Sequence, residues 1–379
     1  MTVSKAAPKG GLEGIIAGDT SLGFIDGEKG ELRYCGYLIK DLAEHSTFVE
    51  TTFLLWHGEL PNRQQMEDLR TSLAAERALP AVALEVLKLV APTLDPMSAL
   101  RTVVSALQCD DVRGPDTGVK ENLRRSVRLT AKLPTIVAAY ERIRSGTNPI
   151  EPRADLSHAA NFLYMLTGEV PHAEVERMLD TCLVLHAEHG FNASTFAARV
   201  TAATLSDMYS SITSAIGALK GPLHGGANTE VMRMLLEIGS VQNVESWLTK
   251  LLAQPGAKIM GFGHRVYKVM DPRALILKEF SKKLAKVTGD SRWYEMSERL
   301  EALVKAKKHI DVNVDFYSAS TYYAMGIRPE LFTAVFAIAR ISGWAAHVLE
   351  QFAHNRLIRP EANWIGSDAR AYVPVSQRG

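Results

Sequence analysis

Residues 331–349 read LFTAVFAIARISGWAAHVL and form the most apolar stretch in the last part of the chain. The stretch is long enough for one extended helix. Arg340 and His347 interrupt it, however, and a bilayer span does not readily accept such residues. The stretch therefore predicts a helix buried in a globular protein. Arg340 then needs an anionic partner, internal or bound, unless its long stem carries the guanidinium to the surface.

Apolar residues recur at a helical period from about Ile39 onward. Phe48, Phe53, Leu54 and Trp56 share one face, and similar patterns occupy residues 63–77, 97–108, 121–144, 155–167, 173–188, 226–239, 271–287, 292–308 and 329–350. Asp95-Pro96 and Asp271-Pro272 are typical of helix starts, whereas Pro134 should kink or interrupt its helix. Because no run of strands alternates with these helices, a Rossmann or barrel architecture is not expected, and the fold class that we expect is all-α.

The first forty residues have a different pattern. They are rich in glycine and contain short strand-like runs at Ile15-Ile16, at residues 23–25 and at residues 31–34, with a turn at residues 26–30. The last two runs and their turn predict a small hairpin. We therefore expect a mainly α fold with a small N-terminal β-hairpin.

The composition excludes several classes of protein. Hydrophobic residues make up 46% of the 379 residues and charged residues 22%, which is ordinary for a globular protein and excludes disordered and fibrous chains. The net charge of +1 provides no overall field for nucleic acid or an anionic membrane, so neither is an expected partner. Three widely spaced cysteines and an N-terminus unlike a signal peptide predict a cytoplasmic protein.

The segment GPLHGGAN (221–228) places His224 on a tight turn before a helix that should start near Ala227. Small neighbours leave room for a ligand to approach. A helix N-terminus lowers the pKa of an imidazole, so a neutral ring here can donate a hydrogen bond to a carbonyl. A turn histidine bonded only to the backbone is the alternative.

The segment GFGHRVYK (261–268), followed by Asp271-Pro272-Arg273, contains His264 between glycines and arginines. Its glycines should expose backbone N–H groups, and Lys258, Arg265, Lys268 and Arg273 surround it, so it resembles a cradle for phosphates or carboxylates. It is not GxGxxG, which makes a dinucleotide site a weak hypothesis. A solvated basic turn is the alternative, but it explains the histidine less well.

His186 and His189 could place two ligands on one helical face, so zinc and a metal-dependent hydrolase are worth considering. HExxH is absent and no third ligand has suitable spacing, so we expect no metal and interpret both as helix-end histidines facing a polar pocket. Asp315 lies in IDVNVDFYS (310–318), where apolar neighbours should raise its pKa toward that of a general base. A helix N-cap is a compatible alternative.

These groups suit one reaction. A carboxylate removes a proton next to a carbonyl while a neutral imidazole stabilises the enol oxygen. A second imidazole polarises an acceptor carbonyl, arginines hold the acceptor's carboxylates, and the basic loop binds the phosphates of a carrier. The combination predicts a Claisen-type condensation of an acyl thioester with an oxoacid. A helical interaction scaffold is the alternative from another class, and it would not need the ordered His–His–Asp set.

GPLHGGAN, GFGHRVYK…DPR and NVDFYSA, in this order, resemble the citrate synthase family in its short, dimeric type. The resemblance implies that His224 polarises the thioester carbonyl, Asp315 removes the proton and His264 activates the keto carbonyl of oxaloacetate. It further implies oxaloacetate and citrate contacts from His189, Arg273, Arg340 and Arg359, the last contributed across a homodimer interface. The implied CoA contacts are Lys258, Gly261, Phe262, Gly263, Arg265 and Lys268.

The implied architecture has a discontinuous large helical domain, residues 1–226 and 326–379, and a small mobile domain, residues 227–325, that closes over the active site. The implied reaction converts acetyl-CoA, oxaloacetate and water to citrate and CoA, the first step of the citric acid cycle. Close relatives use propionyl-CoA to make 2-methylcitrate with the same catalytic residues. One methylene changes specificity by only about 1–3 kcal/mol, so either or both activities remain open. The CoA thioester is a co-substrate, with no permanently bound cofactor and no metal.

Overall fold

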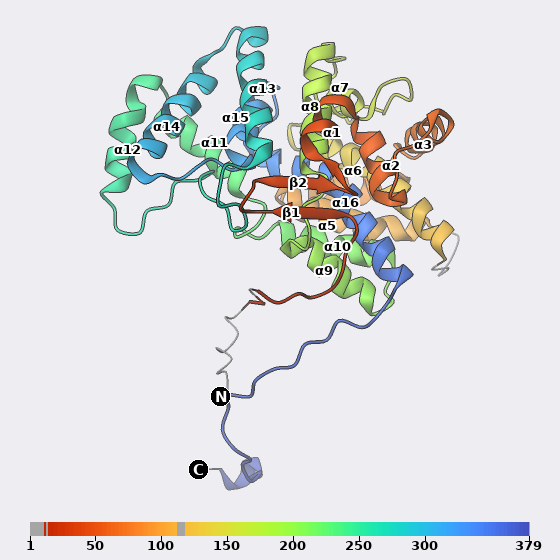
Figure 1. Ribbon diagram of the computed structural model, residues 1–379. Coiled ribbons are helices and arrows are strands. Elements are labelled where there is room, and N and C mark those ends of the chain that lie inside the picture. The colour runs from red at the N-terminus through yellow and green to blue at the C-terminus, as the bar shows by residue number, and fades with distance from the viewer. Residues whose placement is uncertain (1–10, 13, 112–117, 379) are drawn as a thin grey trace.

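The computed structural model describes residues 11–12, 14–111 and 118–378 (Figure 1). The first ten residues, in which we expected no signal peptide, lie outside this part of the chain. The predicted hairpin is confirmed: β1 (Gly23–Asp26) pairs antiparallel with β2 (Glu31–Tyr34), and β3 (Tyr37–Leu38) adds a short third strand that the sequence did not predict. Ile15-Ile16 lies outside this sheet.

Two groups of helices flank the sheet in Figure 1. The larger group contains α1 (Ile39–His45), α2 (Phe48–His57), α3 (Arg63–Ala75), α4 (Ala81–Val90), α5 (Pro96–Ala106), α6 (Val119–Arg144), α7 (His158–Thr167), α8 (Ala173–His186), α9 (Ala193–Ala203), α10 (Met208–Leu219) and α16 (Phe332–Ala353). The smaller group contains α11 (Ala227–Ile238), α12 (Val244–Leu252), α13 (Pro272–Thr288), α14 (Arg292–Lys308) and α15 (Val314–Ala324). Short 3-10 turns η1 (Leu107–Asp110), η2 (Val241–Asn243), η3 (Pro329–Leu331) and η4 (Val375–Gln377) complete the chain. The mainly α class is confirmed.

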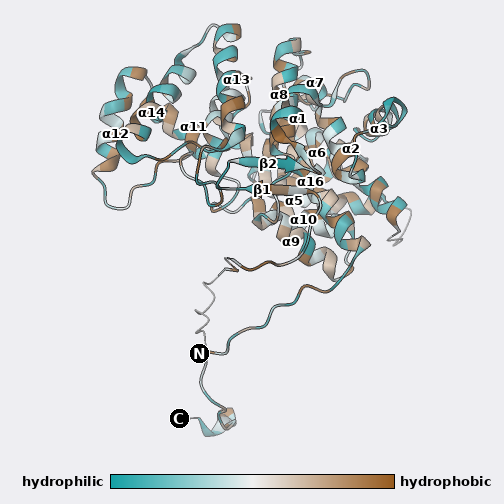
Figure 2. Cartoon of the chain, viewed as in Figure 1, coloured by the Kyte–Doolittle hydropathy of each residue, from teal (hydrophilic) through white to brown (hydrophobic). Residues whose placement is uncertain are grey.

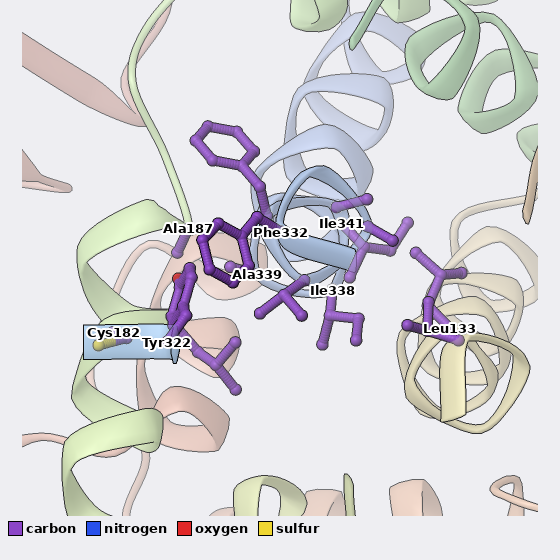
Figure 3. Packing of buried hydrophobic residues seen from close by; sticks show 14 of the residues in the cluster. Leu133, Cys182, Ala187, Tyr322, Phe332, Ile338, Ala339 and Ile341 are labelled. Carbon is purple, nitrogen blue, oxygen red and sulfur yellow. The ribbon is translucent and has the colours of Figure 1, made fainter. Parts of the chain in front are cut away.

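Helix α16 is the centre of the larger group, where it contacts α2, α6, α8, α9 and α10. Its length and hydropathy would suit a membrane span, but 94% of its apolar window is buried inside the protein, as expected for a core helix. Figure 3 shows its Phe332 and Ile338 between Leu133 of α6 and Cys182 of α8, and brown apolar residues follow the packed helix faces in Figure 2.

Arg340 lies inside this core with 2% of its surface exposed, so the alternative of a surface guanidinium is wrong. Its Nε donates a hydrogen bond to the His186 carbonyl (2.6 Å), and its guanidinium lies 4.6 Å from the centre of the Phe336 ring. These contacts hold the side chain in the interior and leave its charge available to the site described below.

Two further expectations need correction. Helix α6 runs through Pro134 without a break, so the interruption, one of the two expected effects of this proline, is wrong; the helix packs against α5, α7 and α16. Helix α7 begins at His158 rather than at residue 155, because the Ser157 side chain accepts the Ala160 N–H (3.1 Å) and caps the helix there. The caps predicted at Asp95 and Asp271 are confirmed.

After α16 the chain leaves the helical body. Residues 354–378 are mostly exposed and extended, and Figure 1 shows them running away from the helices on the same side as the described residues before β1. Arg359 lies on this C-terminal segment, which we call the arm.

Candidate active site

Five of the predicted site residues come from five separate segments. His189 follows the end of α8, His224 is in the turn before α11, and His264 is in the loop before α13. Asp315 lies in the first turn of α15, and Arg340 in the middle of α16. Both groups of helices therefore contribute, and the side-chain interactions below relate these segments to one another.

His224 is held as a neutral hydrogen-bond donor. Its Nε2 accepts the backbone N–H of Ser194 (3.2 Å) and lies 2.8 Å from Ser194 Oγ, so the ring proton of the neutral form is on Nδ1. Trp344 Nε1–H donates to the same hydroxyl and fixes it (3.1 Å). Burial, assisted by the charge of Arg340, lowers the pKa of His224 to about 4. The Nδ1–H makes no hydrogen bond to a described residue, so it is available to a ligand.

His264 has the opposite tautomer. Its Nδ1 accepts the backbone N–H groups of Val266 (3.0 Å) and Tyr267 (3.1 Å), which leaves the proton of the neutral ring on Nε2. Burial, followed by the charge of Arg273, lowers its pKa to about 4. Its ring centre lies 5.5 Å from that of His189. The two groups of helices meet at this point.

His189 contributes a second neutral imidazole to this wall of the site. Its Nε2 lies 3.2 Å from the Tyr267 hydroxyl, which belongs to the loop of His264. Burial lowers the pKa of His189 well below its ordinary value, and the charges of Arg273 and Arg340 add to this effect. Two cations close enough to act on one imidazole indicate a centre that favours negative charge in a ligand.

Asp315 is a half-buried carboxylate without a fixed partner. It is not the N-cap of α15, because Asn313 holds that position and its Oδ1 accepts the Asp315 N–H (3.0 Å). The carboxylate makes no hydrogen bond or ion pair to the described residues. Burial raises its pKa to about 6 against the opposing charges of Arg273 and Arg340. The group can therefore accept a proton from a weak acid near neutral pH.

Arg273 is buried and paired with the cap of its own helix. Its Nε and Nη2 donate to the two carboxylate oxygens of Asp271 (3.0 and 2.7 Å), and Asp271 Oδ2 also accepts the Val314 N–H (3.2 Å). One carboxylate therefore ties the start of α13 to the start of α15. This link fixes Arg273 relative to Asp315.

The basic loop differs from the predicted anion cradle. The Gly263 N–H donates to the Asp311 carbonyl (2.9 Å), and the Gly261 carbonyl accepts the Asn313 N–H (2.9 Å), so the loop forms a β-bridge. The expectation that both glycines expose free N–H groups is wrong, because a distant segment uses that of Gly263. Phe262 packs edge-on against Phe316. Lys258, Arg265 and Lys268 are exposed and make no ion pair within the described residues.

The chain matches known proteins along nearly its whole length. Residues 11–361 match the family model for the citrate synthase C-terminal domain. The chain is 51% identical to citrate synthase 2 of Bacillus subtilis, across 97% of this chain and 98% of that protein. The chain belongs to the citrate synthase family. Within this family it is also 40% identical to 2-methylcitrate synthase of Shewanella oneidensis, over all of both chains.

Solved structures of citrate synthases have the same fold. The citrate synthase of Pyrobaculum aerophilum matches with a TM-score of 0.89 and 42% identity, over 97% of this chain and 95% of its own. The Thermoplasma acidophilum citrate synthase, solved as a ternary complex with carboxymethyl coenzyme A and oxaloacetate, matches with a TM-score of 0.90 and 32% identity, over 97% of this chain and 98% of its own. The chain is therefore an enzyme of the citrate synthase type.

Two other residues named in the sequence analysis, Arg359 and His186, have different surroundings. Arg359 is exposed on the arm and lines a cavity of about 1100 Å³ together with Phe191 and Arg199. His186 is buried, with Nδ1 2.7 Å from the Cys182 carbonyl and its ring edge-on to Phe336. Among the described residues, no three His, Cys, Asp or Glu side chains are grouped to hold a metal.

Two side chains that set the chemistry of the histidines were not predicted from the sequence. Ser194 determines the tautomer of His224, and Tyr267 connects the loop of His264 to His189. Tyr267 lies inside the quoted GFGHRVYK segment, where a buried tyrosine among basic residues was a usable signal. Ser194 lies 30 residues before His224, and only the packing of α9 against the turn brings them together.

Proposed function

We propose that this enzyme condenses acetyl-CoA with oxaloacetate and water to give citrate and CoA. One observation carries the proposal: the charges of the buried Arg340 and Arg273 act on the unpartnered carboxylate of Asp315 and on the neutral rings of His224 and His264, each of which keeps an N–H for a ligand. The fold without these groups would suit a helical scaffold equally well. The solved complex of the Thermoplasma relative, which contains oxaloacetate and a CoA derivative, supports the same choice of substrates.

The first step is formation of an enol. Asp315 accepts a proton from the methyl group next to the thioester carbonyl, while His224 Nδ1–H donates a hydrogen bond to the carbonyl oxygen. A neutral imidazole suits this oxygen because the pKa of its N–H is closer to the pKa of the enol than the pKa of an imidazolium is. The raised pKa of Asp315, about 6, improves its strength as a base while leaving it largely ionised at pH 7.

The second step joins two carbons. The enol carbon attacks the keto carbon of oxaloacetate, and His264 Nε2–H gives its proton to the keto oxygen, which becomes the hydroxyl of the product. The proton that Asp315 took from the methyl group then restores the neutral ring of His264, so no net proton is gained or lost. His189, Arg273 and Arg340 bind the carboxylates of oxaloacetate, with Arg359 supplied by the partner subunit of a homodimer. Water then hydrolyses the product thioester, with transfer of OH to the acyl carbon and of H to the thiolate of CoA.

The exposed cations Lys258, Arg265 and Lys268 would bind the phosphates of CoA, and Gly261, Phe262 and Gly263 would shape the surface beside them. Residues 227–325 would form the small domain that closes on residues 1–226 and 326–379 and excludes water from the enol. No metal enters this scheme. We place the enzyme in the cytoplasm without nucleic-acid or membrane partners.

A second candidate is 2-methylcitrate synthesis from propionyl-CoA and oxaloacetate. The full-length match to the Shewanella 2-methylcitrate synthase favours it. The chemistry is unchanged, since Asp315 would then remove a methylene proton. One additional methyl group in the acyl pocket is worth about 1–3 kcal/mol, so one enzyme can carry both activities.

The deciding experiment measures kcat/KM with acetyl-CoA and propionyl-CoA side by side, by thiol release in the presence of oxaloacetate, and identifies the products by mass. We expect release with acetyl-CoA that depends on oxaloacetate and yields citrate. A ratio that favours propionyl-CoA more than tenfold would assign the enzyme to 2-methylcitrate synthesis. No release with either thioester would reject both candidates and favour the scaffold.

A further inference from the structure

Glu188 is a fully buried carboxylate directly behind the substrate-binding wall. Its exposed fraction is 0%, and it immediately precedes His189. The Gly190 N–H donates to Glu188 Oε1, and the same oxygen lies 3.0 Å from His347 Nε2. Glu188 Oε2 makes no hydrogen bond with the described residues. A buried carboxylate with an unsatisfied oxygen is costly, so its retention calls for a reason.

The fold makes room for this carboxylate with two glycines from distant segments. A Cβ at Gly23 in β1 would lie 2.7 Å from Oε1, and a Cβ at Gly343 in α16 would lie 2.8 Å from Oε2. Any larger residue at either position would push against the carboxylate. The surroundings therefore hold Glu188 in one place from both sides.

The positions of two site residues, His189 and Arg340, depend on where the Glu188 carboxylate is held. Gly190 has a positive φ of 60°, and its N–H closes the turn onto Glu188, which fixes the backbone that carries His189. Arg340 has one hydrogen bond, to the His186 carbonyl, and no ion pair within the described residues. Burial lowers the pKa of Arg340 to about 10, and the charge of Glu188 is the largest influence that opposes this.

On its other side Glu188 faces His347 of α16, which in turn contacts Arg199 of α9. Arg199 Nη1 donates to His347 Nδ1 (3.1 Å) and pairs with Glu350 (2.5 Å). Because Nδ1 of His347 is an acceptor, the proton of its neutral ring is on Nε2, the atom that faces Glu188. Nε2 lies 3.0 Å from Glu188 Oε1 but makes no aligned hydrogen bond with it, so His347 confines the carboxylate on this side by packing and charge.

We propose that Glu188 is a positioning residue for capture of the oxoacid. Its carboxylate fixes the turn of His189 and balances the charge of Arg340 without a direct ion pair, so that the guanidinium N–H groups remain available to a substrate carboxylate. The inference rests on the proposed function and extends it to a residue that does not touch substrate.

Glu188→Gln tests the role of charge at nearly constant shape. We expect the KM for oxaloacetate to rise about tenfold to a hundredfold, because the loss disturbs both His189 and Arg340, while the KM for acetyl-CoA stays within about twofold. Asp180→Asn is the matched control: Asp180 is a buried carboxylate on α8 that accepts the Phe48 N–H (3.1 Å), away from the site. It should leave both KM values unchanged. If Glu188 had a purely structural role, the variant would be less stable but would not raise the KM for oxaloacetate selectively over the KM for acetyl-CoA.

Unchanged oxaloacetate KM and kcat in folded Glu188→Gln would overturn the inference. If that variant does not fold, Gly23→Ala replaces it, since the added methyl displaces a carboxylate that is still present; a wild-type oxaloacetate KM in Gly23→Ala would then be the contrary result. Thermal stabilisation by oxaloacetate is recorded for every variant. Wild-type protein that releases no thiol contradicts the proposed function, whereas an active wild type with an unaffected variant contradicts only the role of Glu188.

Discussion

The carboxylate of Asp315 lies where an uncharged side chain would stabilise the fold. Burial raises its pKa from 3.8 to about 6, so the folded state binds the proton more tightly than the unfolded state does. The free energy of unfolding therefore decreases as pH rises from about 4 to about 6. Above that range the full destabilisation by the ionised carboxylate is present. Each pKa unit corresponds to about 1.4 kcal/mol.

Asp315→Asn should accordingly be more stable than the wild type at pH 8, by about 1–3 kcal/mol. The difference should shrink to well under about 1 kcal/mol at pH 4, where the wild-type carboxyl is protonated in the folded state and about half protonated in the unfolded state. Urea unfolding of the two proteins at both pH values measures it. An Asn variant that is less stable at pH 8 would indicate that the carboxylate has a stabilising partner.

The same shift predicts the pH dependence of activity. Protonation of Asp315 removes the base, so kcat/KM should fall about tenfold per pH unit below about 6. His224 and His264, with pKa values lowered to about 4 by burial, stay neutral throughout this decline. A profile of kcat/KM from pH 4.5 to 9 checks this, and full activity retained at pH 5 would be incompatible with Asp315 as the base.

At the scale of elements, the hairpin supports the loop that carries His264. The Lys268 N–H donates to the Gly27 carbonyl (2.9 Å), and a Cβ at Gly27 would lie 2.2 Å from the Val266 carbonyl oxygen. Because this contact would be with backbone atoms, which cannot rotate away as a side chain can, the loop that carries His264 would have to move. The Val266 N–H that fixes the His264 tautomer would move with it.

Gly27→Ala should therefore lower kcat about tenfold or more and destabilise the protein by about 1–3 kcal/mol. Gly217→Ala is the control, because a Cβ at this α10 position would meet only the flexible Arg101 side chain at 3.8 Å. Steady-state kinetics and thermal unfolding measure both variants. Wild-type kcat in Gly27→Ala would mean that the hairpin contact does not position His264.

The long helices and the hairpin could be predicted because their signals are local: an apolar period, a capping Asp or a glycine turn. Other features depend on residues distant in sequence. Pro134 stays helical because of neighbouring helices, and the Gly263 N–H is occupied by Asp311. The motifs indicated the identity of the site histidines, but only the packing of α9 assigns the proton of His224 to Nδ1.

At the scale of the whole molecule, the arm carries Arg359 to an exposed position beyond the end of α16, which fits a residue that acts in a partner's site. Complementation tests this directly. Mixed Asp315→Asn and Arg359→Leu chains would form heterodimers with one site that contains both Asp315 and Arg359. Each variant alone should be nearly inactive.

After random exchange of subunits, half of the dimers are mixed and each has one intact site, so activity should recover to about a quarter of the wild-type value. Thiol release before and after co-refolding measures the recovery. Absence of recovery, with heterodimers verified by mass, would mean that Arg359 serves the site of its own chain or none.

The most direct test of the central claim is thiol release from acetyl-CoA and oxaloacetate by the wild type and by Asp315→Asn. The wild type should release CoA only when both substrates are present. The variant should be slower by about two to four orders of magnitude, although oxaloacetate still raises its Tm. Equal rates in the two proteins would contradict the assignment of Asp315 as the base at this carbon.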